Sequence, residues 1–270
     1  MSKDWMTKKL PAEYDYVSPG GASEIRLLPS FEQGEIVHAR THPEKPSIPG
    51  TLTGVGEFFY VLKGEGELWR ATGRLEHVVS LHPGRCVSIP PGISYQYRAT
   101  GGPLELLVTT VPRWQKDNWA EAERRYWADE GKVIGATSQA PGPWTTVDLP
   151  KDYHYLAPDG SEIRLLATVD AGGLAHCTLP AGTIAGPVRH RTVKEVWYVV
   201  DGRGEVWRRG GLDEEVVEVV SGTALTIPTG VSFQFRAFQD GPLRVLIGTF
   251  PAWPGASEAE LVPGLWQIGA

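Results

Sequence analysis

His190 and Glu195 are the first residues whose types and spacing could perform acid–base chemistry. They stand five positions apart, and Glu195 begins an aromatic and β-branched run that ends at Val200. An imidazole exchanges protons near neutral pH, so a histidine that faces a carboxylate can act as an acid–base pair. Cys86 and Cys177 are isolated, without the CxxC spacing that zinc or redox sites need, and no G-x-S-x-G nucleophile motif occurs.

The elements that must position this pair come in two copies. The string EIRLL occupies positions 24–28 and again 162–166. The same offset then holds without a gap through Trp69/Trp207 and on to Gly92/Gly230. A repeat this long indicates two domains that arose by duplication, because solenoid repeats are much shorter.

Each copy has the pattern of short strands joined by tight turns. The chain has 270 residues, and its 32 glycines and 22 prolines are too many for a helical bundle. Segments 57–62 and 195–200 are aromatic and β-branched and run into glycine-rich turns, whereas 94–98 and 232–236 alternate aromatic with polar residues. This pattern predicts an all-β protein with a barrel or jelly roll in each half.

One α-helix is predicted between the two halves, from Asp117 to Glu130. Asp117 can cap its start and Gly131 can end it, and Trp119, Tyr126 and Trp127 recur at helical spacing. We expect this aromatic stripe to pack the helix on a barrel or at a dimer contact. The predicted organisation is an N-terminal tail at 1–13, domain 1 at 14–114, helix and linker at 115–150, domain 2 at 151–254 and a C-terminal tail at 255–270.

Composition excludes several classes of function. Hydrophobic residues make up 41% of the chain and charged residues 21%, as in ordinary globular proteins. The net charge of −6 disfavours a nucleic-acid partner, and no stretch is apolar for long enough to span a membrane. The opening MSKDWMTKKL does not lead into an apolar run, so no secretion signal is expected. Two isolated cysteines and no disulfide framework favour a reducing, cytoplasmic location.

The repeated strings resemble the cupin superfamily, and the doubled chain resembles a bicupin. The family's first motif is G-x5-H-x-H-x4-E-x6-G and its second is G-x5-P-x-G-x2-H-x3-N. In the C-terminal copy these motifs fall on Gly182, Val188, His190, Glu195 and Gly202, then on Gly222, Pro228, Gly230, Phe233 and Ala237. In the N-terminal copy they fall on Glu44, Gly50, Leu52, Glu57 and Gly64, then on Gly84, Pro90, Gly92, Tyr95 and Ala99. The resemblance implies two tandem jelly-roll barrels.

The resemblance also implies where a metal would bind. Metal-holding relatives use both histidines and the glutamate of the first motif and the histidine of the second, an N/O set suited to a divalent transition metal. The N-terminal copy keeps only Glu57 of these four ligands, whereas the C-terminal copy keeps His190 and Glu195. We therefore predict no metal cofactor. The alternative is a divalent transition metal on His190 and Glu195 with shifted further ligands.

The surviving pair defines a candidate site in the second barrel. If the motif geometry holds, His190 and Glu195 point inward and serve as catalytic residues, because strand side chains alternate between the two faces. Val188, Trp197, Phe233 and Phe235 share that inward parity and are predicted to bind substrate in an aromatic chamber. The competing interpretation is that His190 and Glu195 are inert remnants of a metal site.

Three further residues are candidates for ligand contact. In the first barrel, Glu57 and Tyr95 either hydrogen-bond to each other or bind the hydroxyl or amine group of a second ligand. On the strand before the first motif, His38 and His176 are expected to be core histidines, with an auxiliary pocket role as the alternative. His176 is the one assigned to the substrate-binding set.

The sequence therefore predicts an intracellular bicupin enzyme for a small molecule. It would perform isomerisation, cyclisation or elimination by metal-independent acid–base chemistry in the C-terminal barrel. The alternatives are a non-catalytic binding protein and a metal-dependent, oxygenase-like cupin with atypical ligands. The expected partner is a small-molecule ligand, with neither nucleic acid nor membrane, and a homodimer is possible.

Overall fold

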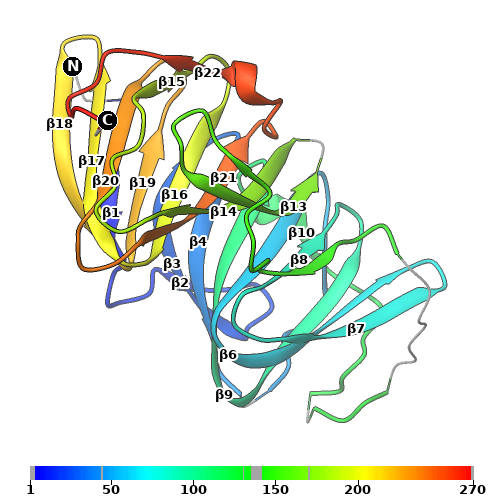
Figure 1. The fold of residues 1–270 in the computed structure, drawn as a ribbon. Helices are drawn as coiled ribbons and strands as arrows, with labels where there is room; N and C mark the ends of the chain where they lie inside the picture. Colours follow the sequence, from blue (N-terminus) through cyan, green and yellow to red (C-terminus); the bar gives the residue numbers. More distant parts are fainter. Residues whose placement is uncertain (1–3, 44, 130, 135–141, 170, 269–270) are drawn as a thin grey trace. The chain divides into compact units, whose positions relative to one another are not determined.

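The protein consists of two all-β units, one around each copy of the repeat (Figure 1). The structure is a computed structural model that describes residues 4–43, 45–129, 131–134, 142–169 and 171–268. The N-terminal barrel comprises Pro11–Leu27 and Gly34–Asp148, and the C-terminal barrel comprises Met1–Leu10, Leu28–Gln33 and Leu149–Ala270. No helix in the described part of the chain is long and apolar enough to cross a membrane.

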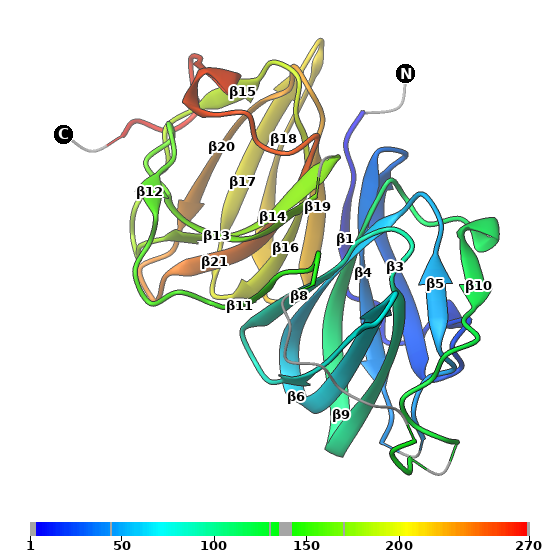
Figure 2. The same ribbon diagram turned by 90° about the vertical axis from the view of Figure 1, so that its right-hand side faces the viewer.

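The C-terminal barrel is built from two sheets, which can be followed in Figures 1 and 2. Its seven-stranded sheet has the order β1-β19-β16-β21-β14-β13-β12, and its five-stranded sheet has the order β18-β17-β20-β15-β22. The strands are β1 (Thr7–Lys9), β12 (Tyr155–Leu156), β13 (Glu162–Val169), β14 (Gly172–Leu179), β15 (Val188–His190), β16 (Lys194–Asp201), β17 (Arg203–Gly210), β18 (Asp213–Val220), β19 (Thr223–Ile227), β20 (Ser232–Ala237), β21 (Leu243–Phe250) and β22 (Ala259–Leu261).

The N-terminal barrel repeats this arrangement with longer strands. Two of them, β6 and β9, pair with each other along most of their length and carry the ten-stranded sheet β11-β8-β6-β9-β4-β3-β2, with β5, β7 and β10 attached. The strands are β2 (Tyr16–Val17), β3 (Ser23–Phe31), β4 (Gly34–Thr41), β5 (Gly50–Leu52), β6 (Gly56–Thr72), β7 (Leu75–Leu81), β8 (Arg85–Ile89), β9 (Ser94–Val111), β10 (Trp119–Glu121) and β11 (Thr146–Asp148).

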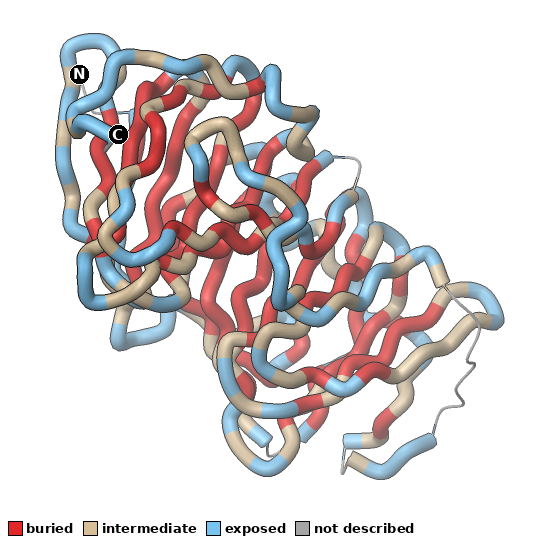
Figure 3. Tube along the Cα trace, in the orientation of Figure 1, coloured by how far each residue is buried: buried red, intermediate tan, exposed pale blue. Residues whose placement is uncertain are grey.

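The core of each barrel consists of the inward faces of these strands, drawn red in Figure 3. Alternation along β16 and β20 places Trp197, Val199, Phe233 and Phe235 in the core of the C-terminal barrel. This is the period of two that a strand requires. The all-β prediction and the two tandem barrels are confirmed.

The predicted helix from Asp117 to Glu130 is wrong. Asp117 lies in a single 3₁₀ turn, η1 (Lys116–Asn118), and the chain then continues as β10. β10 pairs with β5, with Trp119 opposite Leu52, so tertiary pairing overrides the helical spacing of the aromatic residues. Position 130 and positions 135–141 of the predicted linker lie outside the described residues. At the C-terminal end, where no element was predicted, η2 (Ala256–Glu258) and β22 form.

The segment in front of each repeat pairs with the barrel of the other repeat. β1, within the predicted N-terminal tail, pairs with β19 of the C-terminal barrel, and β11, within the predicted linker, pairs with β8 of the N-terminal barrel. One buried arginine fastens each segment. Arg208 donates to the carbonyls of Met6 and Thr226, at 3.0 and 2.9 Å, and to the hydroxyl of Thr7.

The N-terminal barrel has the matching arginine at the equivalent position. Arg70 donates to the carbonyls of Ser88 and Thr145, at 2.8 and 3.0 Å, and to the Thr146 hydroxyl at 2.7 Å. Both guanidinium groups lie in the interior, and each joins a carbonyl of the leading segment to a carbonyl of the neighbouring strand or loop. The two fastened segments therefore depend on these arginines.

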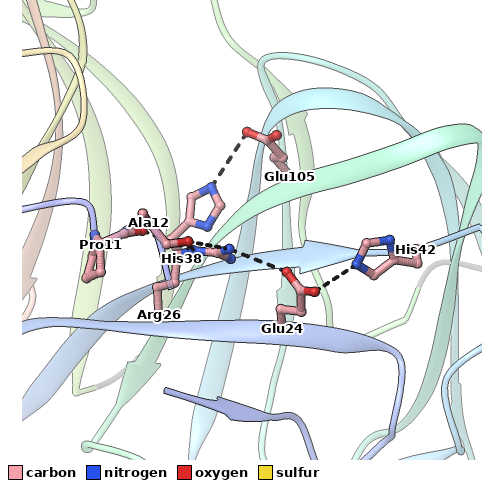
Figure 4. Close-up of polar contacts among 7 residues, drawn as sticks. All are labelled: Pro11, Ala12, Glu24, Arg26, His38, His42 and Glu105. Carbon is pink, nitrogen blue, oxygen red and sulfur yellow. Dashed lines mark hydrogen bonds and ion pairs between the residues drawn. The ribbon is translucent and has the colours of Figure 1, made fainter. Parts of the chain in front are cut away.

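A second repeated arginine holds the chain shortly before β2 and β12. Figure 4 shows Arg26 donating to the carbonyls of Pro11 and Ala12, both at 3.1 Å, and approaching Glu24. Glu24 in turn lies 3.1 Å from His42. In the C-terminal barrel, Arg164 binds the carbonyls of Pro150 and Lys151 in the same way. The identity of this arginine in both repeats reflects a structural role.

We expect Arg208→Leu to loosen β1 and to destabilise the C-terminal barrel by about 3 kcal/mol, because the buried guanidinium's hydrogen bonds to the Met6 and Thr226 carbonyls are lost. Hydrogen exchange at the amides of β19 should accelerate. The control is Arg209→Leu, on the next residue of the same strand, which is exposed and should change stability by less than about 0.5 kcal/mol. Equal exchange rates in the two variants would contradict the role given to Arg208.

Candidate functional site

A cavity of about 630 Å³ lies in the C-terminal barrel. Six of the residues predicted from the sequence line it together: Val188, His190, Glu195, Trp197, Phe233 and Phe235. Strand parity explains this convergence, since β15 and β20 pair with Val188 opposite Phe233, and β16 presents Glu195 and Trp197 on one face.

His190 is held between aromatic rings on the cavity wall. Its ring makes edge contacts with Phe233 and with Trp253, each at a centroid distance of 5.1 Å. Its Nδ1 lies 3.9 Å from Oε1 of Glu195 and has no hydrogen-bond partner among the described residues. The side chain is 4% exposed. The imidazole is therefore fixed in place while one nitrogen remains free to accept or donate a proton.

Glu195 is a buried carboxyl group with a hydrogen bond to one of its two oxygens. The indole N–H of Trp197 donates to its Oε2 at 2.7 Å, which leaves Oε1 directed toward His190. Burial raises the pKa of Glu195 above its ordinary value, and the neighbouring His190 and Trp197 oppose that rise. A carboxyl group with a raised pKa keeps its proton to a higher pH than an exposed one does.

Asp159 is a third ionisable residue of the cavity, and the sequence analysis missed it. It lies on the turn between β12 and β13, where the backbone N–H and the hydroxyl of Ser161 donate to its Oδ1 at 2.9 and 2.7 Å. Burial raises the pKa of the Asp159 carboxyl, whereas Ser161 and His190 lower it. A signal existed in the repeat, because the matching turn of the N-terminal copy has Gly20 and Gly21 where this one has Asp159 and Gly160.

The lining also includes Tyr155, Cys177, Thr249 and Trp253, which the sequence analysis did not assign. They lie on β12, β14 and β21 and on the segment that follows β21. Burial raises the pKa of the Cys177 thiol far above neutrality, so this cysteine is a poor nucleophile.

His176, predicted as a substrate contact, lies outside the lining of this cavity. It neighbours Cys177 on β14, and adjacent strand residues face opposite ways, so only Cys177 reaches the cavity. Burial lowers the pKa of His176 to about 4, and Arg164 and Arg244 add to the effect. The imidazole is therefore a neutral, buried group on the other face of its strand.

The N-terminal barrel has a hollow of only about 70 Å³ at the equivalent place. Glu57 and Tyr95 both line it, as predicted, together with Trp119. The Tyr95 hydroxyl hydrogen-bonds to the Glu57 carboxyl group, but Oε2 of Glu57 has no partner among the described residues. Burial raises the pKa of Glu57 to about 8.

One exchanged side chain accounts for much of the difference in volume. β10 pairs with β5 as β22 pairs with β15, and this register places Trp119 opposite Leu52 and Ala259 opposite His190. Trp119 packs against Gly50, where a Cβ would collide with the indole. Ala259 has no such bulk, so the C-terminal cavity stays open.

The residues present do not match the four-ligand metal site of the family motif. Val188 and Phe233 offer no donor atoms, and no group of three or more His, Cys, Asp or Glu side chains within the described residues lies close enough to hold a metal ion. The cofactor assignment from the sequence stays a prediction, tested below.

The family of sequences described as "Cupin domain" matches this chain twice, over 37–110 and 175–248. An uncharacterized protein of Methanocaldococcus jannaschii, MJ1618, is 30% identical over 104 residues, which make up 37% of this chain and 80% of that protein.

Solved structures show the same doubled fold. Oxalate decarboxylase of Bacillus subtilis superposes with a TM-score of 0.68 at 13% identity, covering 92% of this chain and 76% of that one. Procruciferin, an 11S globulin of Brassica napus, superposes with a TM-score of 0.66 at 15% identity, covering 95% and 85%. At such identities the likeness concerns the fold alone.

We expect Glu57→Gln to stabilise the protein at neutral pH. The pKa of Glu57 is ordinarily 4.5 and is about 8 in the folded protein. At pH values between these two, folded Glu57 keeps a proton that the unfolded chain has released. The contribution of Glu57 to the free energy of unfolding is fully present below pH 4.5, and it falls by up to about 1.4 kcal/mol per pH unit between pH 4.5 and about 8.

The measurement is urea unfolding of wild type and Glu57→Gln across this pH range, with the exposed Glu65→Gln as control. The gap between Glu57→Gln and wild type should widen as pH rises. A gap that stays constant would show that Glu57 is ionised in the folded protein.

We expect Val188→His/Phe233→His to bind close to one equivalent of a divalent transition metal, because it completes a set of three imidazoles and one carboxylate. Wild type, loaded and dialysed in parallel, should retain far less by mass spectrometry of metal content. Near-stoichiometric metal in wild type that is lost in His190→Ala/Glu195→Ala would contradict the predicted lack of a metal cofactor.

Proposed function

Because this chain belongs to the cupin family and carries the domain twice, we propose that it is a small-molecule enzyme that works through proton transfer in its C-terminal barrel. The observation that carries the proposal is His190, held in a 630 Å³ apolar cavity beside the buried carboxyl group of Glu195. The reaction would be an isomerisation, a cyclisation or an elimination, with no metal required.

The cavity has the character of a ligand site. Its volume falls within the range of about 300–1,000 Å³ that is usual for small-molecule pockets. Its walls are mostly aromatic and aliphatic, and its histidine and two carboxyl groups come from different elements: His190 from β15, Glu195 from β16 and Asp159 from the β12–β13 turn. Apolar walls bind the body of a ligand, and the few polar groups orient it.

His190 is proposed as the general base. As it accepts a proton from the substrate it becomes positive, and the Glu195 carboxylate, 3.9 Å from Nδ1, stabilises that charge. The Trp197 indole N–H fixes Oε2 of Glu195, so the carboxylate keeps its direction during the transfer. Aromatic contacts with Phe233 and Trp253 hold the imidazole plane.

Return of the proton completes the reaction. His190 can give it back at a different atom of the substrate, which is an isomerisation. Asp159 can instead protonate a leaving oxygen, which is an elimination, because burial raises the pKa of its carboxyl group. If His190 takes the proton from a substrate hydroxyl group, that oxygen can add to a double bond of the same molecule while the neighbouring carbon takes the proton back, which is a cyclisation.

The N-terminal barrel is proposed as a scaffold, since Trp119 and Tyr95 fill the space where a ligand would bind. A reducing, cytoplasmic setting belongs to the proposal as well, because Cys86 and Cys177 are both free and buried. The decarboxylase activity of the Bacillus subtilis relative is not carried over, because 13% identity supports only the fold.

Two variants separate catalysis from binding. A metabolite library is screened for compounds that raise the melting temperature of wild type, and each hit is then analysed for a product isomer by NMR. We expect His190→Gln to lower turnover by about 10²–10⁴-fold while the thermal shift persists. Ala259→Trp, which copies the filled N-terminal barrel, should abolish both binding and turnover.

Hits recovered unchanged, with binding lost in Ala259→Trp, would establish a non-catalytic binding protein instead. Turnover that survives His190→Gln would remove His190 from the mechanism.

A further inference from the structure

The C-terminal cavity is acidic in composition. Two carboxyl groups, Asp159 and Glu195, contribute to its lining, and no lysine or arginine does so among the described residues. His190 is the one described lining side chain that can become positive, and Glu195 already lies 3.9 Å from it.

An anionic ligand would meet no compensating charge in this cavity. A buried anion needs a paired cation or several hydrogen-bond donors, and its cost rises further near other carboxylates. The Ser161 N–H and hydroxyl are donated to Asp159, and the Trp197 indole N–H is donated to Glu195. These donors are therefore already engaged with the protein's own carboxyl groups.

A basic or hydroxylated ligand meets the opposite situation. Asp159 and Glu195 can accept its N–H or O–H groups, and Nδ1 of His190 is a further partner without a hydrogen bond of its own. The rings of Trp197, Phe233, Phe235 and Trp253 line the same space and attract a cation through their faces. An apolar body fits the remaining walls.

We propose that the C-terminal cavity selects ligands with an apolar body and a basic or uncharged polar head, and that it excludes carboxylates and phosphates of the same shape. This inference names the substrate class of the site and rests on the proposed function for the location of that site. It concerns binding, so it can be tested without turnover.

The test uses three probes that share one indole body and differ only in the head group: tryptamine, tryptophol and indole-3-acetate. Each is titrated against the whole protein at about pH 7.5, where the first is a cation and the last an anion. The readout is displacement of the neutral fluorophore N-phenyl-1-naphthylamine. Tryptamine and tryptophol should each bind at least about tenfold more tightly than indole-3-acetate.

Three variants assign the selectivity to the cavity. Asp159→Asn/Glu195→Gln should reduce the ratio of tryptamine to indole-3-acetate affinity toward one. Asp240→Asn, which removes an exposed carboxylate paired with Arg203, should leave the ratio unchanged. Ala259→Trp should lose all three probes, which would place them in the cavity.

Equal or tighter binding of indole-3-acetate by wild type would overturn the proposal. So would the failure of all three probes to bind at millimolar concentration, or selectivity that survives Ala259→Trp. Selective binding without any chemical conversion of the library hits would instead remove the proposed catalysis and leave this inference intact.

Discussion

Each barrel contains a glutamate at the same place of its apolar interior, and the surroundings of that carboxyl group differ between the two barrels. Glu57 and Glu195 occupy equivalent places, and both are more than nine-tenths buried. An ionised carboxylate in such a place is costly unless it is paired. In the N-terminal barrel, the Tyr95 hydroxyl hydrogen-bonds to the Glu57 carboxyl group, and burial raises the pKa of Glu57 to about 8. Protonation therefore removes the charge that a single hydrogen bond does not compensate. In the C-terminal barrel, the Trp197 indole N–H donates to the Glu195 carboxyl group, and His190 lies 3.9 Å from it.

The contrast between the two barrels follows from a few exchanged side chains on a common frame. Arginines equivalent to each other hold equivalent carbonyl groups in both units, so the frame was kept after duplication. The side chains that occupy the barrel interior differ between the two copies. Trp119 closes the interior of one barrel, whereas Ala259 leaves the other open to a ligand.

The two-barrel fold and the central residues of the candidate site could be predicted from the sequence. Motif spacing fixes strand parity, and parity places His190, Glu195 and Phe233 on one wall without knowledge of the coordinates. Asp159 could not be placed in this way, because it lies on a turn that only the closed barrel brings to the cavity. The helix prediction after Asp117 failed because the aromatic spacing suits a helix as well as a short strand followed by irregular chain.

The crossed pairing of β1 and β11 has a consequence for biosynthesis. β1 precedes every strand of the N-terminal barrel but belongs to the C-terminal barrel, because its partner β19 lies more than two hundred positions further along the chain. The N-terminal barrel, in contrast, has all its strands once β11 has emerged. During translation, β1 must therefore stay without its sheet partner until β19 has emerged. The charged side chains of Lys8 and Lys9 favour exposure of β1 to water until it pairs with the edge of its sheet.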